Sequence, residues 1–190
     1  MRDWTAYSDG DLLRRSESGD EEAFAALYRR RQGSVYRFAL RMSGSPDIAE
    51  EATQEVFLML ARARHGYDAG RGPLEAFLLG VARNHVRRCI ERDRAFLPLP
   101  DPREDGEIGP ASCAPDVLGD LTRKESLEAV RRAVLSLPPD YREVVVLCDL
   151  EEVDYAAAAG ILGCPVGTVR SRLHRARGML LAKLRARCLV

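Results

Sequence analysis

Residues 163–177 read Gly-Cys-Pro-Val-Gly-Thr-Val-Arg-Ser-Arg-Leu-His-Arg-Ala-Arg, and this stretch decides the fold. Pro165 suits a first helical turn, because its ring fixes φ and the N–H that it lacks would have no partner there. The apolar side chains that follow recur at three- and four-residue steps, as one face of a helix requires: Val166, Val169, Leu173, Ala176, Leu180 and Leu184. The segment therefore predicts an amphipathic helix that begins near Pro165.

The other face of this helix is basic and carries hydroxyl groups. Between Pro165 and Arg187 there are seven Lys or Arg residues and no Asp or Glu. Arginine can reach guanine edges in the major groove, and hydroxyl groups and further arginines can bind phosphate. The side chains that we expect on DNA are Thr168, Arg170, Ser171, Arg172, His174 and Arg175. The alternative is a solvated basic face, and this helix alone does not separate the two.

The sequence just upstream favours DNA binding. Residues 155–161 form an alanine-rich segment, and residues 162–164 interrupt the helical pattern. Ala159, Gly163 and Val169 stand where a helix-turn-helix needs a small residue, a turn glycine and a packed aliphatic side chain. Glycine accepts the positive φ that such a turn uses. The two segments together predict a helix-turn-helix.

Composition is that of a globular protein with its charge segregated. Charged residues make up 31% and hydrophobic residues 46% of the chain, and the formal net charge is zero. Residues 3–55 carry more acid than base, whereas the last helix is purely basic. This asymmetry suggests that one end binds nucleic acid and the other binds a protein partner.

Cysteine usage and hydropathy indicate a cytoplasmic protein. The five cysteines include no Cys-x-x-Cys pair, which argues for free thiols in a reducing compartment. No apolar run approaches the length of a membrane span, and the N-terminus has no targeting pattern, so we expect no membrane insertion.

We expect neither a metal site nor a cofactor. Zinc needs clustered ligands, and the three histidines form no ligand pattern with the cysteines. His85 lies on the apolar stripe of its helix, which predicts a satisfied core histidine, and Cys89 and Cys164 are interpreted as small core residues. No paired carboxylates, glycine-rich phosphate loop or Ser/His/Asp set stands out, so the sequence gives little support to an enzyme.

A proline- and glycine-rich stretch divides the chain. In residues 97–123, acidic side chains outnumber basic ones and apolar ones are sparse, which predicts a flexible acidic linker. On both sides the periodicity is helical, with no convincing alternating strand. The predicted fold class is all-α, with two small helical domains at residues 11–96 and 124–187 joined by this linker.

The first domain begins with a helix that starts at residues 20–22 and continues through Met42, and Gly44-Ser45-Pro46 interrupts it. A second helix is expected from Asp47 to about Arg64. Its predicted inward stripe is Ile48, Ala52, Val56, Met59 and Ala63. Its predicted outward face holds Glu50, Glu51, Gln54, Phe57 and Leu58. Large apolar groups among acids predict a docking surface, unless another helix of the domain covers Phe57.

A third helix is expected from Leu74 to about Arg94, after a loop that contains three glycines. Arg83, Asn84 and Arg87 lie on its polar side. Amides read base edges, and guanidinium groups stack on bases or bind phosphate, so a loop and helix of this kind can hold an extruded base.

Three segments resemble one protein family. The string Pro165 to Arg177 closely resembles region four of the extracytoplasmic-function (ECF) sigma factors, the smallest bacterial initiation factors of RNA polymerase. Residues 49–57 resemble sigma region two, which grips the clamp helices of the polymerase largest subunit. Residues 79–84 resemble the family segment that melts the −10 promoter element.

The resemblance implies a role for each predicted surface. Residues 11–96 would be sigma region 2 and residues 124–187 sigma region 4, which would bind the −35 element. The core polymerase contacts would be Glu50, Glu51, Gln54, Phe57 and Leu58, and the −10 contacts would be Tyr67, Asp68, Arg71, Arg83, Asn84 and Arg87. The implied partners are core RNA polymerase, through its β′ clamp helices and β flap, promoter DNA, and an anti-sigma factor.

The alternative function is that of a stand-alone helix-turn-helix regulator, which binds DNA without polymerase. Such a regulator would need a ligand-binding or phosphoacceptor module in its first domain, and an acidic helix with outward Phe57 and Leu58 is neither. The sequence also departs from the family pattern: Cys148 stands where an arginine often reaches a phosphate, Arg88 where aspartate is frequent, and Ala157 and Ala158 replace a usual Glu-Ile pair.

Overall fold

The structure is a computed structural model that describes residues 3–62, 66–96 and 118–188. Secondary structure in these ranges is helical throughout, and they contain no β-strand. The all-α prediction is therefore confirmed for this part of the chain. None of the described helices combines the length and apolarity needed to cross a bilayer.

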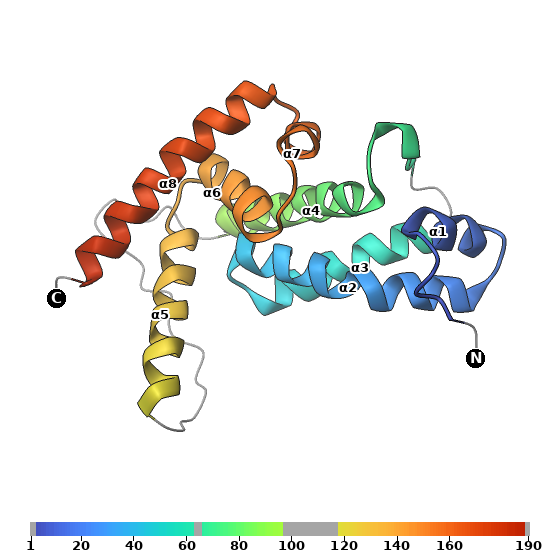
Figure 1. Cartoon of the computed structure of the whole chain (residues 1–190), viewed down its shortest axis with the longest axis horizontal. Helices are drawn as coiled ribbons and strands as arrows, with labels where there is room; N and C mark the ends of the chain where they lie inside the picture. Colours follow the sequence, from blue (N-terminus) through green and yellow to red (C-terminus); the bar gives the residue numbers. More distant parts are fainter. Residues whose placement is uncertain (1–2, 63–65, 97–117, 189–190) are drawn as a thin grey trace.

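The N-terminal half contains α1 (Asp9–Glu17), α2 (Glu21–Ser43), α3 (Pro46–Ala61) and α4 (Leu74–Phe96), with a 3-10 turn, η1 (Ala69–Arg71), before α4. Helix α2 packs against α1, α3 and α4, and its long run beside α3 is visible in Figure 1. Phe38, Val56 and Leu78 come from three of these helices and are fully buried in one core. Burial of each such side chain stabilises the fold by about 1.5–3 kcal/mol.

Local capping residues fix where these helices begin and end. The Asp20 side chain accepts a hydrogen bond from the Ala23 N–H and so caps α2. Gly44 ends α2 in the left-handed conformation at φ 75°, and Ser45 then caps α3, whose first residue is Pro46. The break predicted at Gly44-Ser45-Pro46 is confirmed.

The inward face of α3 is rotated from the predicted one. The buried residues are Ala49, Ala52, Thr53, Val56, Phe57 and Leu60, whereas Ile48 and Met59 are half-buried. The prediction that Phe57 faces outward is wrong: its side chain is 4% exposed and packs edge-on against Tyr28 of α2, with ring centroids 4.7 Å apart. Leu58 does face outward, with 49% exposure.

The C-terminal half contains α5 (Leu118–Leu135), α6 (Pro139–Val145), a π-helical segment η2 (Val146–Leu150), α7 (Tyr155–Leu162) and α8 (Val166–Cys188). Helix α5 begins inside the stretch predicted as linker, and residues 97–117 of that stretch lie outside the described residues. Gly163 takes φ 65° between α7 and α8. The helix-turn-helix is therefore present, with its glycine at the turn.

The two halves are packed together (Figure 1). Helix α4 lies against α7, and α2 contacts both α5 and η2. Arg142 donates to the Met42 carbonyl at 2.7 Å, and Arg41 pairs with Glu151 and donates to the Leu150 carbonyl at 3.0 Å. Each half thus supplies an arginine that binds polar groups of the other.

Candidate nucleic-acid and protein interfaces

Helix α8 has the two faces that its sequence predicts. Val169, Leu173 and Ala176 are buried against the rest of the C-terminal half. The predicted DNA-contacting side chains lie on the other side: Arg170, Ser171, His174 and Arg175 are exposed, and Thr168 and Arg172 are half-buried. Folding therefore leaves a basic, hydroxylated surface on α8 facing outward.

Acidic side chains hold some of these arginines. Arg172 pairs with Asp140 of α6 at 2.8 Å, and Arg177 donates to both carboxylate oxygens of Asp149 at 3.0 and 2.6 Å. The hydrogen bonds and charge of Asp149 raise the pKa of the Arg177 guanidinium above its usual value. Among the described residues, Arg175 has no hydrogen-bond or ion-pair partner. Arg175 is thus free to reach a ligand.

Helix α4 places two predicted −10 contacts at the junction of the halves. Arg83 forms an ion pair with Glu143 of α6 at 2.8 Å and donates to the Ile161 carbonyl at 3.4 Å. Arg87 lies 3.8 Å from the same carboxylate. The side chains of Arg83 and Glu143 are only 11% and 2% exposed, so in this structure Arg83 faces the other half rather than solvent. Asn84 is exposed.

Hydrogen bonds and a ring contact of Tyr67 and Asp68 stabilise the loop before α4. The Tyr67 hydroxyl donates to the Gly72 carbonyl at 3.1 Å, and its ring packs against Phe77 at 5.5 Å between centroids. Burial, then the charges of Asp9 and Asp68, raise the pKa of Tyr67, so the phenol stays protonated. Asp68 is exposed and caps η1 by accepting from the Gly70 N–H at 2.9 Å. The side chain of Arg71 lies outside the described residues.

The predicted docking helix borders a hollow that the sequence did not reveal. A depression of about 500 Å³ lies between α2 and α3, and Glu50 and Gln54 line its α3 side. Residues of α2 form the opposite side: Tyr28, Arg29, Gln32, Gly33 and Tyr36. The sequence assigned no function to these α2 residues. Two tyrosines at helical spacing, Tyr28 and Tyr36, were the signal that could have identified them.

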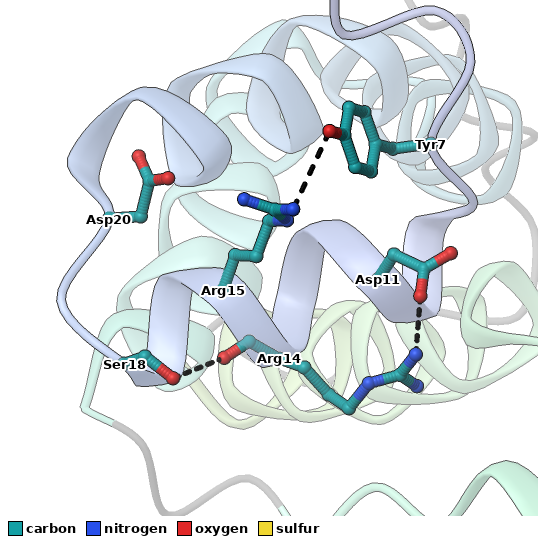
Figure 2. A pocket seen from close by; sticks show the side chains of 6 residues that line it. All are labelled: Tyr7, Asp11, Arg14, Arg15, Ser18 and Asp20. Carbon is teal, nitrogen blue, oxygen red and sulfur yellow. Dashed lines mark hydrogen bonds and ion pairs between the residues drawn. The ribbon is translucent and has the colours of Figure 1, made fainter.

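A second depression, of about 480 Å³, lies at α1 near the N-terminus (Figure 2). Its lining is polar and charged: Tyr7, Asp11, Arg14, Arg15, Ser18 and Asp20. Figure 2 shows Arg15 directed at the Tyr7 hydroxyl, at 3.5 Å, and Arg14 paired with Asp11. None of the residues predicted to bind DNA or polymerase lines it.

One departure from the family pattern is Cys148, which stands where an arginine often reaches a phosphate. The thiol is half-buried in η2, and burial raises its pKa to about 11. It is therefore neutral at physiological pH and supplies none of the positive charge that an arginine would bring to a phosphate.

Comparison with known proteins places both halves in one family. Residues 27–96 match the family model of sigma-70 region 2, and residues 127–180 match that of sigma-70 region 4. The ECF RNA polymerase sigma factor SigE of Mycolicibacterium smegmatis is 33% identical, over 86% of this chain and 63% of its own, so the chain spans less than two thirds of that relative. The ECF RNA polymerase sigma-E factor of Escherichia coli K12 is 32% identical, over 90% of this chain and 91% of its own.

A solved structure has the same fold. CnrH, in complex with the cytosolic domain of CnrY, superposes with a TM-score of 0.66 at 25% identity, over 92% of this chain and 96% of CnrH. Two family models in the expected order, two similar relatives and this structure all indicate one family. The chain belongs to the extracytoplasmic-function sigma factors of the sigma-70 family.

Proposed function

We propose that the chain docks on the β′ clamp helices of core polymerase through the α2/α3 hollow, reads a −35 element with α8, and binds the −10 element with α4 and the loop before it. The observation that carries the docking assignment is Leu58. It is half exposed, one helical turn from Gln54 at the edge of the hollow, on a helix whose neighbouring Phe57 and Leu60 are buried. An exposed leucine beside carboxylates and a hollow suits a basic, partly apolar partner.

The assignment of α8 rests on its unpaired basic groups. Arg175 and His174 project from the helix that follows the turn, on the face opposite the buried Val169 and Leu173. This is the placement that a recognition helix uses to reach base edges in the major groove.

Binding of the −10 element by α4 requires the two halves to separate. Arg83 is held by Glu143 in the packed arrangement, and a −10 strand would have to replace that carboxylate with a phosphate or a base. We infer that the packed arrangement is a resting state and that promoter binding opens it.

Two further points of function follow by analogy. The structure of CnrH contains the cytosolic domain of a second protein, CnrY. We propose that an anti-sigma factor binds this chain in a comparable way.

We also place the protein in the cytoplasm, where core polymerase works, and assign it no catalytic activity of its own.

The docking assignment can be tested by Leu58→Asp and Glu50→Lys in the full chain. Leu58→Asp buries an unpaired charge at the interface, and Glu50→Lys puts a positive charge against a basic partner. Both side chains are exposed, so the fold should survive. We expect each variant to lose binding to purified core polymerase while still binding upstream promoter duplex.

Leu127→Asp is the matched control, because Leu127 is a 64% exposed leucine on α5, away from the hollow. It should bind polymerase normally. Full polymerase binding by both Leu58→Asp and Glu50→Lys would show that the α2/α3 face is not the docking surface.

A further inference from the structure

Three side chains of different chemistry meet where α3 packs on α4. They are Glu51 of α3 and His85 and Cys89 of α4, and their potential ligand atoms all lie within 4.8 Å of one another. His85 Nε2 is 3.4 Å from Glu51 Oε1, and Cys89 Sγ is 3.9 Å from Glu51 Oε2. His85 and Cys89 share a face because they are four residues apart on one helix.

His85 departs from its predicted role as a satisfied core histidine. Its side chain is 13% exposed, and its Nε2 atom is fully buried with no hydrogen-bond partner in the described part of the chain. Cys89 is 3% exposed, whereas the Glu51 side chain is 47% exposed. A buried nitrogen without a hydrogen bond destabilises the fold, and a water molecule or a bound ion can satisfy it.

We propose that Glu51, His85 and Cys89 bind a thiophilic divalent cation of the zinc type. Carboxylate oxygen, imidazole nitrogen and thiolate sulfur are the ligands that zinc takes in proteins. Zinc–ligand bonds of about 2.0–2.3 Å place the ligand atoms of a tetrahedral site about 3.4–3.6 Å apart. The spacing of the three groups is already close to this, and closing the site needs shifts of about 1 Å. Solvent can supply the fourth ligand on the exposed side of Glu51.

Two neighbouring positive charges, those of Arg92 and Arg88, act on the Cys89 thiol and oppose the ion. Arg92 Nη2 lies 3.9 Å from Glu51 Oε2, and Arg92 also pairs with Asp93 at 3.4 Å. The Arg92 side chain is 53% exposed, so it can turn into solvent when a cation takes its place. Removal of Arg92 should therefore strengthen metal binding, whereas removal of a ligand should weaken it.

The sequence alone did not show this site, because its third ligand comes from a different helix. His85 and Cys89 at helical spacing are only two ligands, and Glu51 joins them only once α3 packs on α4.

Titration of the purified full chain with Co²⁺ under reducing conditions tests the proposal. Bound at this site, Co²⁺ should give the visible bands of tetrahedral coordination and a near-ultraviolet thiolate-to-cobalt band, and Zn²⁺ should abolish both. A variant with serine at the other four cysteines, which leaves Cys89 as its single thiol, should keep the near-ultraviolet band. Adding Cys89→Ser to that variant should remove it.

The Co²⁺ affinities of three variants give a second test, because the proposal predicts a decrease, an increase and no change. We expect Glu51→Gln to weaken Co²⁺ binding at least tenfold, Arg92→Gln to strengthen it, and Glu50→Gln, the adjacent carboxylate on α3, to leave it unchanged. Zn²⁺ should raise the Tm of the wild type and not that of Glu51→Gln, whose exposed position favours normal folding. The proposal is overturned if the wild type binds no Co²⁺, if the single-thiol variant folds but lacks the band, or if Glu51→Gln binds as tightly as wild type.

One consequence rests on the proposed function: because Glu51 lies beside the docking surface, a bound ion should weaken binding to core polymerase. The cobalt experiment does not depend on this. Failure of the metal-free protein to bind polymerase would contradict only the proposed function, and polymerase binding by a protein that takes up no metal would contradict only the metal site.

Discussion

Two arginines on one face of α8 differ in what surrounds them. Arg172 is held by Asp140 at 2.8 Å, whereas Arg175 has no partner among the described residues. An ion pair restricts where a guanidinium can go and has to be exchanged before that group binds DNA, so Arg175 is the better candidate for reading a base.

Arg175→Ala should cost about 1–3 kcal/mol in binding to the cognate upstream element, because a bidentate arginine–guanine contact contributes that much discrimination. Fluorescence anisotropy with the cognate duplex and an unrelated duplex would measure it. Binding to the unrelated duplex should change little.

Arg185→Ala is the matched control for this prediction, since Arg185 is also exposed on α8 but lies more than two turns beyond Arg175. It should affect both duplexes alike or neither. An equal loss on both duplexes for Arg175→Ala would reassign that residue to phosphate contact.

At the scale of elements, the turn of the helix-turn-helix depends on the backbone of one glycine. Gly163 has φ 65°, and a Cβ placed there would meet no atom within 4 Å. Any loss on substitution therefore comes from backbone strain and not from a clash.

Gly163→Ala should lower the free energy of unfolding by about 1–2 kcal/mol, the cost of the left-handed conformation for a residue with a side chain. Gly160→Ala is the control: Gly160 is helical in α7, has equally open surroundings, and should gain up to about 1 kcal/mol from higher helix propensity. Urea unfolding of both variants would measure this. Equal effects of the same sign would contradict the assigned role of Gly163.

Local signals in the sequence predicted the limits of α2, α3, α4 and α7 to within about three residues, whereas α1, α5 and α6 were not predicted separately. Which side of α3 faces inward depends on the helices that pack against it. Gly44, Ser45 and Pro46 each act through their own backbone or cap, so they mark the α2–α3 break wherever the helices pack. Residues 56–60 are apolar at every position, and periodicity cannot tell which of them face inward. Tyr28 of α2 decides this by packing on Phe57.

Ion pairs between arginines and acidic residues far apart in the sequence likewise could not be predicted from the sequence. The Arg83–Glu143 and Arg172–Asp140 pairs join residues that meet only after the helices pack. The basic faces of α4 and α8 were thus identifiable, but which of their arginines are free was not.

At the scale of the whole molecule, Glu143 links the two halves. It is 1% exposed and lies between Arg83 at 2.8 Å and Arg87 at 3.8 Å. Removal of one partner of a buried pair leaves the other charge uncompensated, which typically costs about 3–5 kcal/mol. Here the halves can relieve that cost by separating and exposing Arg83 to solvent.

Glu143→Gln should therefore increase the radius of gyration in small-angle scattering and strengthen binding of a single-stranded −10 oligonucleotide. Glu91→Gln is the control, because Glu91 also faces Arg87, at 3.9 Å, but is 68% exposed within α4. An unchanged radius and unchanged oligonucleotide binding in Glu143→Gln would show that this ion pair does not hold the halves together.

Run-off transcription with purified core polymerase, on genomic fragments that include the promoter of this protein's own gene, tests sigma function most directly. We expect discrete transcripts only when the protein and core polymerase are both present, and their loss with Leu58→Asp. Binding of the protein alone to specific duplexes, with no transcript from any fragment and no association with core polymerase, would contradict sigma function and indicate a stand-alone helix-turn-helix regulator.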